Sequence, residues 1–294
     1  MNTKLMQEKD LEKVSPIFKG KLGNQLAKFV LHFLSIDKIN SIYGRSSDFK
    51  GSAFTERFLK GVGVEYLIGN AEHLMQLPEG AFVTVSNHPY GGLDGIMLID
   101  MIAGIRPDYK FMVNQFLSLV KTMDDNFIKV TPKTDISDSQ SKTSLAGIRE
   151  TLKRLQSGHP VGFFPAGAVS NFYLKHFHIR DREWQKSILK LIQSAKVPVL
   201  PIRFFDHNSA FFYFLGLIDW RIRSLRLPSE ILNKKGKQLH IGIGEMISVE
   251  EQSKFTDYQT YGDFLRNALY DLPKPSSYTS MSEVVNNLKS NSNT

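Results

Sequence analysis

A histidine and an aspartate in one short segment are well placed for acid–base chemistry. His88 and Asp94 lie in the segment 86–94, SNHPYGGLD. Histidine titrates near neutral pH, and an aspartate hydrogen-bonded to one ring nitrogen leaves the other free to accept a proton. Gly91 and Gly92 let the backbone turn tightly enough to bring the two side chains together. The same residues equally fit a histidine near a helix start, with Asp94 as a first-turn acid on the helix dipole.

Three further segments are expected at the same sheet edge. Asn114 follows an apolar run. The segment 162–171 passes from an apolar run into a turn of Pro165 and small residues, whose backbone N–H groups could bind an anion or a developing oxyanion. Prolines in the segment 197–203 place it at an edge or a change of direction. By themselves, Asn114 and Ser170 are more typical of helix caps.

The elements around these residues alternate between strands and helices from about Val64 onward. The apolar run 81–85 predicts a buried strand just before His88, where ligands gather in open α/β sheets. We therefore expect an α/β fold, a mainly parallel sheet flanked by helices. Strands are expected at 82–85, 110–113, 127–130, 161–164, 199–204 and 239–243. Helices are expected at 95–105, 115–123, 141–156, 183–194 and 261–272.

Three regions are expected along the chain: an N-terminal helical segment 1–63, an α/β domain 64–272 and a polar C-terminal tail 273–294. The first contains a helix with an apolar face and a second helix between Asp48 and Gly61. These helices either pack on the domain, which is the default, or lie on a membrane. The tail is rich in Ser and Asn, so at least its last part is expected to be disordered. The residues of the first apolar face are Leu22, Leu26, Phe29, Val30, Phe33 and Leu34.

Composition sets limits on the kind of protein. The 294 residues are 41% hydrophobic and 22% charged, which is typical of a globular protein. The absence of cysteine excludes disulfides, thiolate metal sites and cysteine nucleophiles, and fits a reducing compartment. The polar first residues predict no signal peptide, and no apolar run predicts a transmembrane helix.

The net charge of +8 favours an acidic partner, such as an anionic membrane surface or an acidic carrier protein. No nucleic acid is expected, because basic residues are not interleaved with aromatic ones. The apolar run 210–220 is followed directly by arginines, which suits an interfacial segment on an anionic membrane. A buried core element with a solvated end fits equally well. The residues predicted to face a membrane are Phe211, Phe212, Trp220, Arg221 and Arg223.

Together, and in this order, three blocks resemble the motifs of the glycerolipid acyltransferase family. That family carries Asn-His…Asp, Phe-Pro-Glu-Gly and Val-Pro-Val-x-Pro; this chain has the 86–94 segment, Phe-Pro-Ala-Gly at 164–167 and Val-Pro-Val-Leu-Pro at 197–201. The resemblance covers roughly residues 65–250. It is nearest to the hemolysin-like branch, whose relatives include acyltransferases that make ornithine and glycine aminolipids.

The resemblance implies roles for the matching residues. His88 would be the general base that deprotonates an acceptor hydroxyl, and Asp94 would hold its imidazole in the right tautomer. Backbone N–H groups from Pro165 to Ala168 would stabilise the tetrahedral intermediate or bind the acceptor. No bound cofactor is implied; acyl-ACP or acyl-CoA would be the co-substrate. The expected substrate-binding residues are Asn87, Gly91, Gly92, Asn114, Pro165, Ala166, Gly167, Ser170, Pro201 and Arg203.

Two departures from the family pattern bear on the acceptor. Five residues separate His88 from Asp94 instead of the usual four, as in the hemolysin-like branch. The Glu and Arg that the family associates with glycerol phosphate are replaced by Ala166 and Val169. These replacements disfavour lysophosphatidic acid as the acceptor and favour a lyso-aminolipid.

We therefore expect an O-acyltransferase on the cytoplasmic membrane surface that acylates a lyso-aminolipid of glycine or ornithine type. Its partners would be acyl carrier protein, the lyso-lipid acceptor and an anionic membrane. One alternative is a lysophosphatidic acid acyltransferase in which Arg203, or Arg180 with Arg182, replaces the missing phosphate contacts. Another is a non-catalytic membrane-binding protein on this fold. No metal site is expected, because His176 and His178 have no further strong ligand beyond Asp181.

Overall fold

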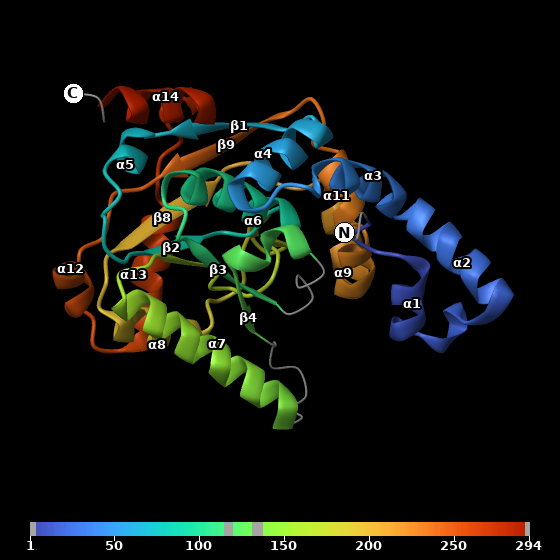
Figure 1. Cartoon of the computed structure of the whole chain (residues 1–294). Helices are drawn as coiled ribbons and strands as arrows, with labels where there is room; N and C mark the ends of the chain where they lie inside the picture. Colours follow the sequence, from blue (N-terminus) through green and yellow to red (C-terminus); the bar gives the residue numbers. More distant parts are fainter. Residues whose placement is uncertain (1–3, 115–119, 131–137, 292–294) are drawn as a thin grey trace.

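One eight-stranded sheet forms the centre of the fold in the computed structural model, which describes residues 4–114, 120–130 and 138–291. The strand order is β10-β1-β9-β8-β2-β5-β3-β4. The pairs β1–β9, β8–β2, β2–β5, β5–β3 and β3–β4 are parallel, whereas β10–β1 and β9–β8 are antiparallel. The predicted α/β fold with a mainly parallel sheet is confirmed (Figure 1). The strands are β1 (Glu65–Gly69), β2 (Val83–Ser86), β3 (Lys110–Asn114), β4 (Phe127–Val130), β5 (Val161–Phe163), β8 (Val199–Phe204), β9 (Gln238–Ile243) and β10 (Thr279–Ser280).

Helices cover both faces of this sheet, as a parallel sheet requires. On one face lie α3 (Ile36–Ser46), α4 (Gly51–Val62) and α6 (Gly92–Leu98), whose apolar side chains share a core with Leu200 and Ile202 of β8. On the other lie α7 (Asp138–Gln156), α8 (Lys186–Ala195) and α13 (Tyr258–Tyr270), which pack against Val83 and Val85 of β2. All four residues of β2 are buried, so the strand before His88 is held from both sides.

Most expected elements occur within a few residues of their predicted bounds. The helix predicted from 95 begins earlier, at Gly92, and continues as a π-helical turn, Ile99–Ala103. Of the helix predicted at 115–123, residues 115–119 lie outside the described residues, and a 3₁₀ helix spans Lys121–Asn126. The sequence pattern did not reveal β1, or the antiparallel hairpin of β6 (Asn171–Tyr173) and β7 (His178–Arg180).

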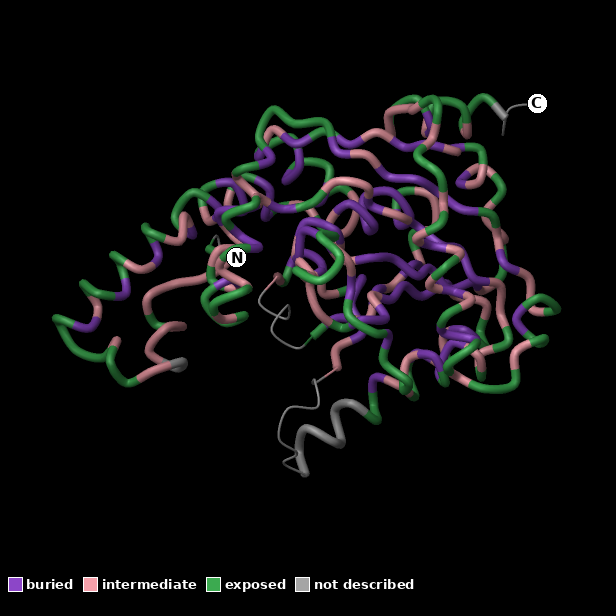
Figure 2. Tube along the Cα trace, turned by 180° about the vertical axis from the view of Figure 1, so that it is seen from behind, coloured by how far each residue is buried: buried purple, intermediate pink, exposed green. Residues whose placement is uncertain are grey.

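The N-terminal helices differ in how they pack. They comprise α1 (Glu8–Val14), a 3₁₀ turn (Pro16–Phe18), α2 (Gly20–Phe33), α3 and α4. Phe54, Phe58 and Leu59 of α4 are buried, so this helix packs on the domain, the default expectation. In contrast, α2 exposes most of its predicted apolar face: Leu22, Phe29 and Phe33 are each more than 60% exposed. Figure 2 shows green, exposed segments along this helix, which extends away from the sheet.

The C-terminal region is ordered where disorder was expected. β10 pairs with β1, and α14 (Met281–Asn291) follows it along the edge of the sheet (Figure 1). The expectation of disorder is wrong for residues 279–291, because Val284 is 1% exposed and joins the core under β1. Residues 292–294 lie outside the described residues.

Shorter helices complete the described fold: α5 (Glu72–Met75), α9 (Ala210–Ile218), α10 (Trp220–Leu225), α11 (Leu227–Leu232) and α12 (Val249–Ser253). Within the described ranges, none of the helices has the length and hydrophobicity needed to span a bilayer.

Candidate active site

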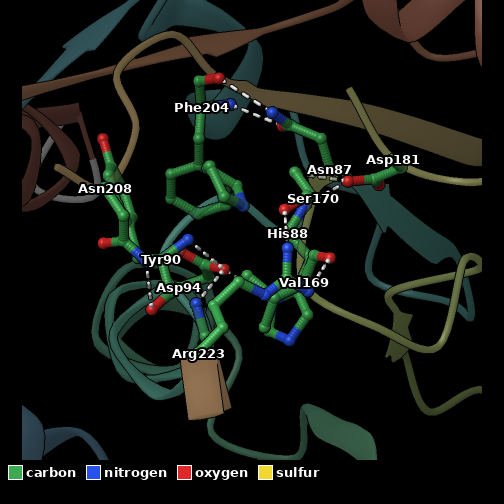
Figure 3. Close-up of polar contacts among 12 residues, drawn as sticks. Asn87, His88, Tyr90, Asp94, Val169, Ser170, Asp181, Phe204, Asn208 and Arg223 are labelled. Carbon is green, nitrogen blue, oxygen red and sulfur yellow. Dashed lines mark hydrogen bonds and ion pairs between the residues drawn. The ribbon is translucent and has the colours of Figure 1, made fainter. Parts of the chain in front are cut away.

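His88 and Asp94 form a direct hydrogen-bonded pair at the carboxyl end of β2. The distance from His88 Nδ1 to Asp94 Oδ2 is 2.5 Å. The same carboxylate accepts hydrogen bonds from the backbone N–H groups of Tyr90, at 3.0 Å, and Gly91, at 3.1 Å. Four donor–acceptor contacts therefore hold Asp94 within the turn that carries His88. Figure 3 shows this carboxylate facing the loop.

The turn depends on a glycine at position 91. Gly91 has φ +90°, a left-handed region that other residues rarely adopt. A Cβ there would also lie 2.7 Å from Leu227 of α11. Gly92 is the first residue of α6. The two predicted glycines thus shape the turn through their backbone.

The two members of the pair differ in burial, and this difference fits different chemical roles. Asp94 is fully buried, whereas the His88 side chain is 17% exposed. Burial raises the pKa of the Asp94 carboxyl, and the hydrogen bonds from His88 and the backbone oppose that rise. Because Asp94 occupies Nδ1, Nε2 is the nitrogen left to exchange a proton with a substrate. The imidazole also stacks on Phe164, with ring centroids 3.9 Å apart, which fixes the plane of the ring.

The turn after β5 is bound directly to this loop. The Ser170 N–H donates to the His88 carbonyl at 2.9 Å, and the Ser170 hydroxyl donates to Asp181 at 2.5 Å. Asp181 also accepts the His88 backbone N–H at 3.2 Å, so one carboxylate joins both segments. Asp181 is fully buried, and burial raises the pKa of its carboxyl. In the sequence, Asp181 stands out only as a neighbour of His176 and His178; no local spacing links it to His88, 93 residues away.

Several backbone groups of the turn after β5 make hydrogen bonds within the protein. The Gly167 N–H donates to the Phe164 carbonyl at 2.9 Å, so it is not an open anion-binding donor as expected. Ala166 is fully buried, and its carbonyl accepts a hydrogen bond from Arg182 at 2.8 Å. The Pro165 carbonyl accepts the Gln185 N–H. Phe164 and Ser170 of this block contact His88, whereas Pro165, Ala166 and Gly167 make the hydrogen bonds that hold the turn.

Other predicted substrate-binding residues have structural contacts. Both ends of the Asn87 amide bond the backbone of Phe204, at 2.8 and 2.9 Å, which ties β2 to β8. Pro201 is buried in β8. Arg203 donates to the backbone carbonyls of Tyr270 and, at 2.7 Å, Leu272. Asn114 ends β3 at the same sheet edge as His88 and is exposed.

The structure corrects two of the five residues predicted to face a membrane. Phe212 is fully buried and Arg223 is 6% exposed. Phe211 and Trp220 are exposed by 52% and 64%, and Arg221 is exposed too. Because α9 packs over the catalytic loop, its inner side chains cannot face outward.

Two contacts attach this segment to the catalytic loop. Tyr213 of α9 donates to the Pro89 carbonyl at 3.3 Å, and Asn208 donates to the Tyr90 carbonyl at 3.4 Å. The apolar run after β8 therefore has a second role that its composition does not indicate, which is to position the loop that carries His88. The described residues contain no group of three or more His, Cys, Asp or Glu placed to hold a metal ion.

The chain has relatives among known proteins. A family model described as "Acyltransferase" matches residues 12–277. The lyso-glycine lipid O-acyltransferase of Bacteroides thetaiotaomicron is 28% identical over 276 residues, 90% of this chain and 97% of the relative. The enzyme with the same name from Phocaeicola vulgatus is 26% identical over 274 residues, 90% and 94% of the two chains. The crystal structure of the 1-acyl-sn-glycerophosphate (LPA) acyltransferase PlsC from Thermotoga maritima aligns with a TM-score of 0.48 and 14% identity, over 84% of this chain and 86% of that one.

Proposed function

Because this chain belongs to the acyltransferase family, we propose that it transfers a fatty acyl chain from a thioester donor to the hydroxyl of a lyso-glycine lipid. The chain is an enzyme that transfers acyl groups, as the resemblance of its motifs implied. The glycine-type acceptor is inferred from the names of the two curated relatives. The replacement of the family's Glu and Arg by Ala166 and Val169 also favours an acceptor without a phosphate.

The observation that carries the mechanism is the 2.5 Å contact between His88 Nδ1 and Asp94. Nε2 of His88 takes the proton of the acceptor hydroxyl as its oxygen attacks the thioester carbonyl. The buried Asp94 stabilises the imidazolium and keeps Nδ1 protonated. The tetrahedral intermediate then collapses, the C–S bond breaks, and the leaving thiolate takes the proton from Nε2. The products are an ester and a free thiol, and no covalent acyl-enzyme forms.

The donor is proposed to be acyl carrier protein, with coenzyme A as the second choice. An acidic carrier protein is complementary to a chain of net charge +8. The same charge suits an anionic membrane, where the lyso-lipid acceptor would reside.

We propose that the enzyme binds the cytoplasmic membrane surface through its outer apolar surface. This surface consists of the exposed apolar residues of α2 and α9–α10, and α11 lies between these elements: Ser229 of α11 donates to the Leu34 carbonyl at the end of α2. Its residues are Leu22, Leu26, Phe29, Phe33, Phe211, Phe214, Leu217, Ile218, Trp220, Ile222 and Leu225.

Lysophosphatidic acid is the weaker acceptor candidate. The three arginines that could replace the missing phosphate contacts each make a contact within the protein, although such contacts leave other guanidinium donors unused. Arg203 is engaged by two backbone carbonyls, and Arg182 by the Ala166 carbonyl. Arg180 lies over the ring of Tyr270, 4.1 Å from its centroid.

An acyl-transfer assay tests the proposal. Labelled acyl-ACP and acyl-CoA are each offered with lyso-glycine lipid, lyso-ornithine lipid and lysophosphatidic acid. We expect transfer to lyso-glycine lipid and a fall of about 10²–10⁴-fold in His88→Ala and in Asp94→Asn. His159→Ala is a matched control, because His159 also pairs with an aspartate, Asp108 at 2.8 Å, but its side chain is 43% exposed.

The outcomes test the identity of the acceptor and the mechanism separately. Acylation of lysophosphatidic acid alone would exclude the aminolipid acceptor. Transfer that survives His88→Ala at the level of His159→Ala would exclude the general-base role.

A further inference from the structure

Arg223 carries a buried positive charge beside the catalytic loop. The residue lies on α10 and is 6% exposed. Its guanidinium donates to the Ser170 carbonyl at 3.1 Å and to the Val169 carbonyl at 3.3 Å. It also donates to Oδ1 of Asn171 at 2.6 Å. Figure 3 shows the side chain reaching from α10 toward Val169 and Ser170.

This charge has no carboxylate partner. Among the described residues, no Asp or Glu lies within ion-pair distance of Arg223. Its acceptors are two carbonyls and one amide oxygen, all neutral. Buried charges in proteins are normally paired with an opposite charge, so a buried guanidinium that has only neutral acceptors is a candidate for binding an anion from outside the chain.

Part of the guanidinium is also left without an acceptor. Arginine has five N–H donors. Three are used by Ser170, Asn171 and Val169, and Nε is buried with no hydrogen-bond partner. The unused donors are on Nε and Nη2, two nitrogens of one planar group that can bind both oxygens of a carboxylate.

The fold makes room for this side chain. A Cβ at Gly216 of α9 would lie 2.7 Å from Cδ of Arg223. The guanidinium carbon also lies 5.2 Å from the centre of the Phe212 ring. The absence of a side chain at Gly216 and the buried ring together let the cation enter the interior, so α9 is built around it.

The position of the charge links it to the reaction. Ser170, whose carbonyl Arg223 bonds, donates its own N–H to the carbonyl of His88. Arg223 also donates to the carbonyl of Val169, the residue directly before Ser170. The guanidinium is therefore linked to the backbone of His88 through a single residue, Ser170.

We propose that Arg223 binds the carboxylate of the acceptor lipid and selects acceptors that carry one. This inference rests on the proposed function. A glycine linked to a lipid through its nitrogen keeps a free carboxylate, a planar anion with one charge. One guanidinium with two free donors matches that group, whereas a phosphate monoester carries more charge and more acceptor oxygens.

The test compares lyso-glycine lipid with its primary amide, which keeps the size but loses the charge. In the wild-type enzyme, kcat/KM should be about 10- to 100-fold higher for the acid, the range for one hydrogen-bonded charge pair. In Arg223→Gln this preference should vanish, through loss of activity on the acid. Arg221→Gln is the matched control: an exposed arginine on the same helix, whose loss should leave the acid-to-amide ratio unchanged.

Each result bears on a different claim. If the wild-type enzyme acylates neither compound but acylates another lyso-lipid, the proposed function fails. If it acylates acid and amide equally well, the function stands and the role of Arg223 is wrong; this readout needs no variant to fold. Arg223→Gln that keeps the wild-type ratio also overturns the inference. Gly216→Ala, which crowds Arg223, should reduce the ratio.

Discussion

Two buried carboxylates hold His88 by different atoms. Asp94 accepts a hydrogen bond from the imidazole, and Asp181 accepts one from the backbone N–H. Both side chains are 0% exposed, and burial raises the pKa of each carboxyl. The first contact sets the tautomer and the second sets the position of the backbone. The catalytic nitrogen thus depends on Asp181, which itself need not touch a substrate.

Asp181→Asn should therefore act through position. Both hydrogen bonds end on one oxygen of Asp181, Oδ1, which the amide oxygen of asparagine can replace as an acceptor, but the negative charge that strengthens these bonds is lost. We expect kcat to fall about 10-fold with KM for the acceptor nearly unchanged, since small displacements of a catalytic group reduce rate strongly. Steady-state kinetics give the two constants. Ser170→Ala, which removes one donor to the same carboxylate, should show a smaller effect; a change in KM alone would assign Asp181 to substrate binding instead.

For single residues, the contacts that could be predicted from the sequence are those between residues close together along the chain. His88, Asp94 and the glycines between them belong to one segment, and their motif predicted the contact that the structure contains. Asp181, directly after β7, and Arg223, on α10, approach that segment only through folding. No periodicity or spacing encodes such contacts. For Arg223, its aromatic neighbours even favoured a membrane-facing prediction.

Packing between elements also produces a second cluster of buried polar groups, around Asp100. Asp100, in the π-helical turn after α6, accepts hydrogen bonds from Tyr66 of β1 at 2.6 Å and Thr55 of α4 at 3.0 Å. Burial raises the pKa of Asp100 to about 6. This pKa is the net result: burial is the largest cause, Glu56 also raises the pKa, and the two hydrogen bonds and Lys60 lower it.

The sign of the resulting pH effect follows from linkage. Between the ordinary pKa of 3.8 and the folded value of about 6, the folded state binds more protons than the unfolded state. The free energy of unfolding therefore falls as the pH rises through this range. Asp100→Asn should remove this contribution and gain up to about 3 kcal/mol relative to wild type between pH 4 and pH 7. Urea unfolding at both pH values measures it.

A surface carboxylate provides the control for this measurement. Asp125 is 81% exposed, so Asp125→Asn should keep the pH dependence of the wild type. Equal slopes for Asp100→Asn and wild type would show that the buried cluster does not destabilise the folded state at neutral pH.

Helices and strands could be predicted where a single sequence pattern, such as a continuous apolar run, determines them. Buried parallel strands are continuous apolar runs, so β2, β4 and β8 were found within a residue of their bounds. The tail after Pro273 was misjudged because its Ser and Asn content hides Val284, which reaches the core. For α2, helical periodicity identified an apolar face but carries no information on what covers it.

Over the whole molecule, exposed apolar residues and positive charge occur together. Phe29 and Phe33 are each 65% exposed, and their rings stack on the outside of α2. Trp220 is 64% exposed, with Arg221 directly after it. Figure 1 shows the arm of α2 and helices α9 and α11 at the same end of the molecule. Large exposed apolar patches mark interaction sites, and the net charge of +8 favours an anionic one.

The enzyme should therefore bind vesicles that contain anionic lipid, and the aromatic residues of α2 should account for much of that binding. Replacing Phe29 and Phe33 together by Ser should lower the partition coefficient about 10-fold or more, since burial of one phenylalanine contributes roughly 1.5–3 kcal/mol. Sedimentation with phosphatidylglycerol vesicles measures this coefficient. Leu145→Ser is the matched control, because Leu145 is 53% exposed on α7, which Figure 1 shows well apart from α2. If both variants bind like wild type, α2 does not contact the membrane. If the variant of Phe29 and Phe33 binds vesicles weakly but keeps its activity on acceptors in detergent, its defect lies in access to the lipid and not in chemistry at His88.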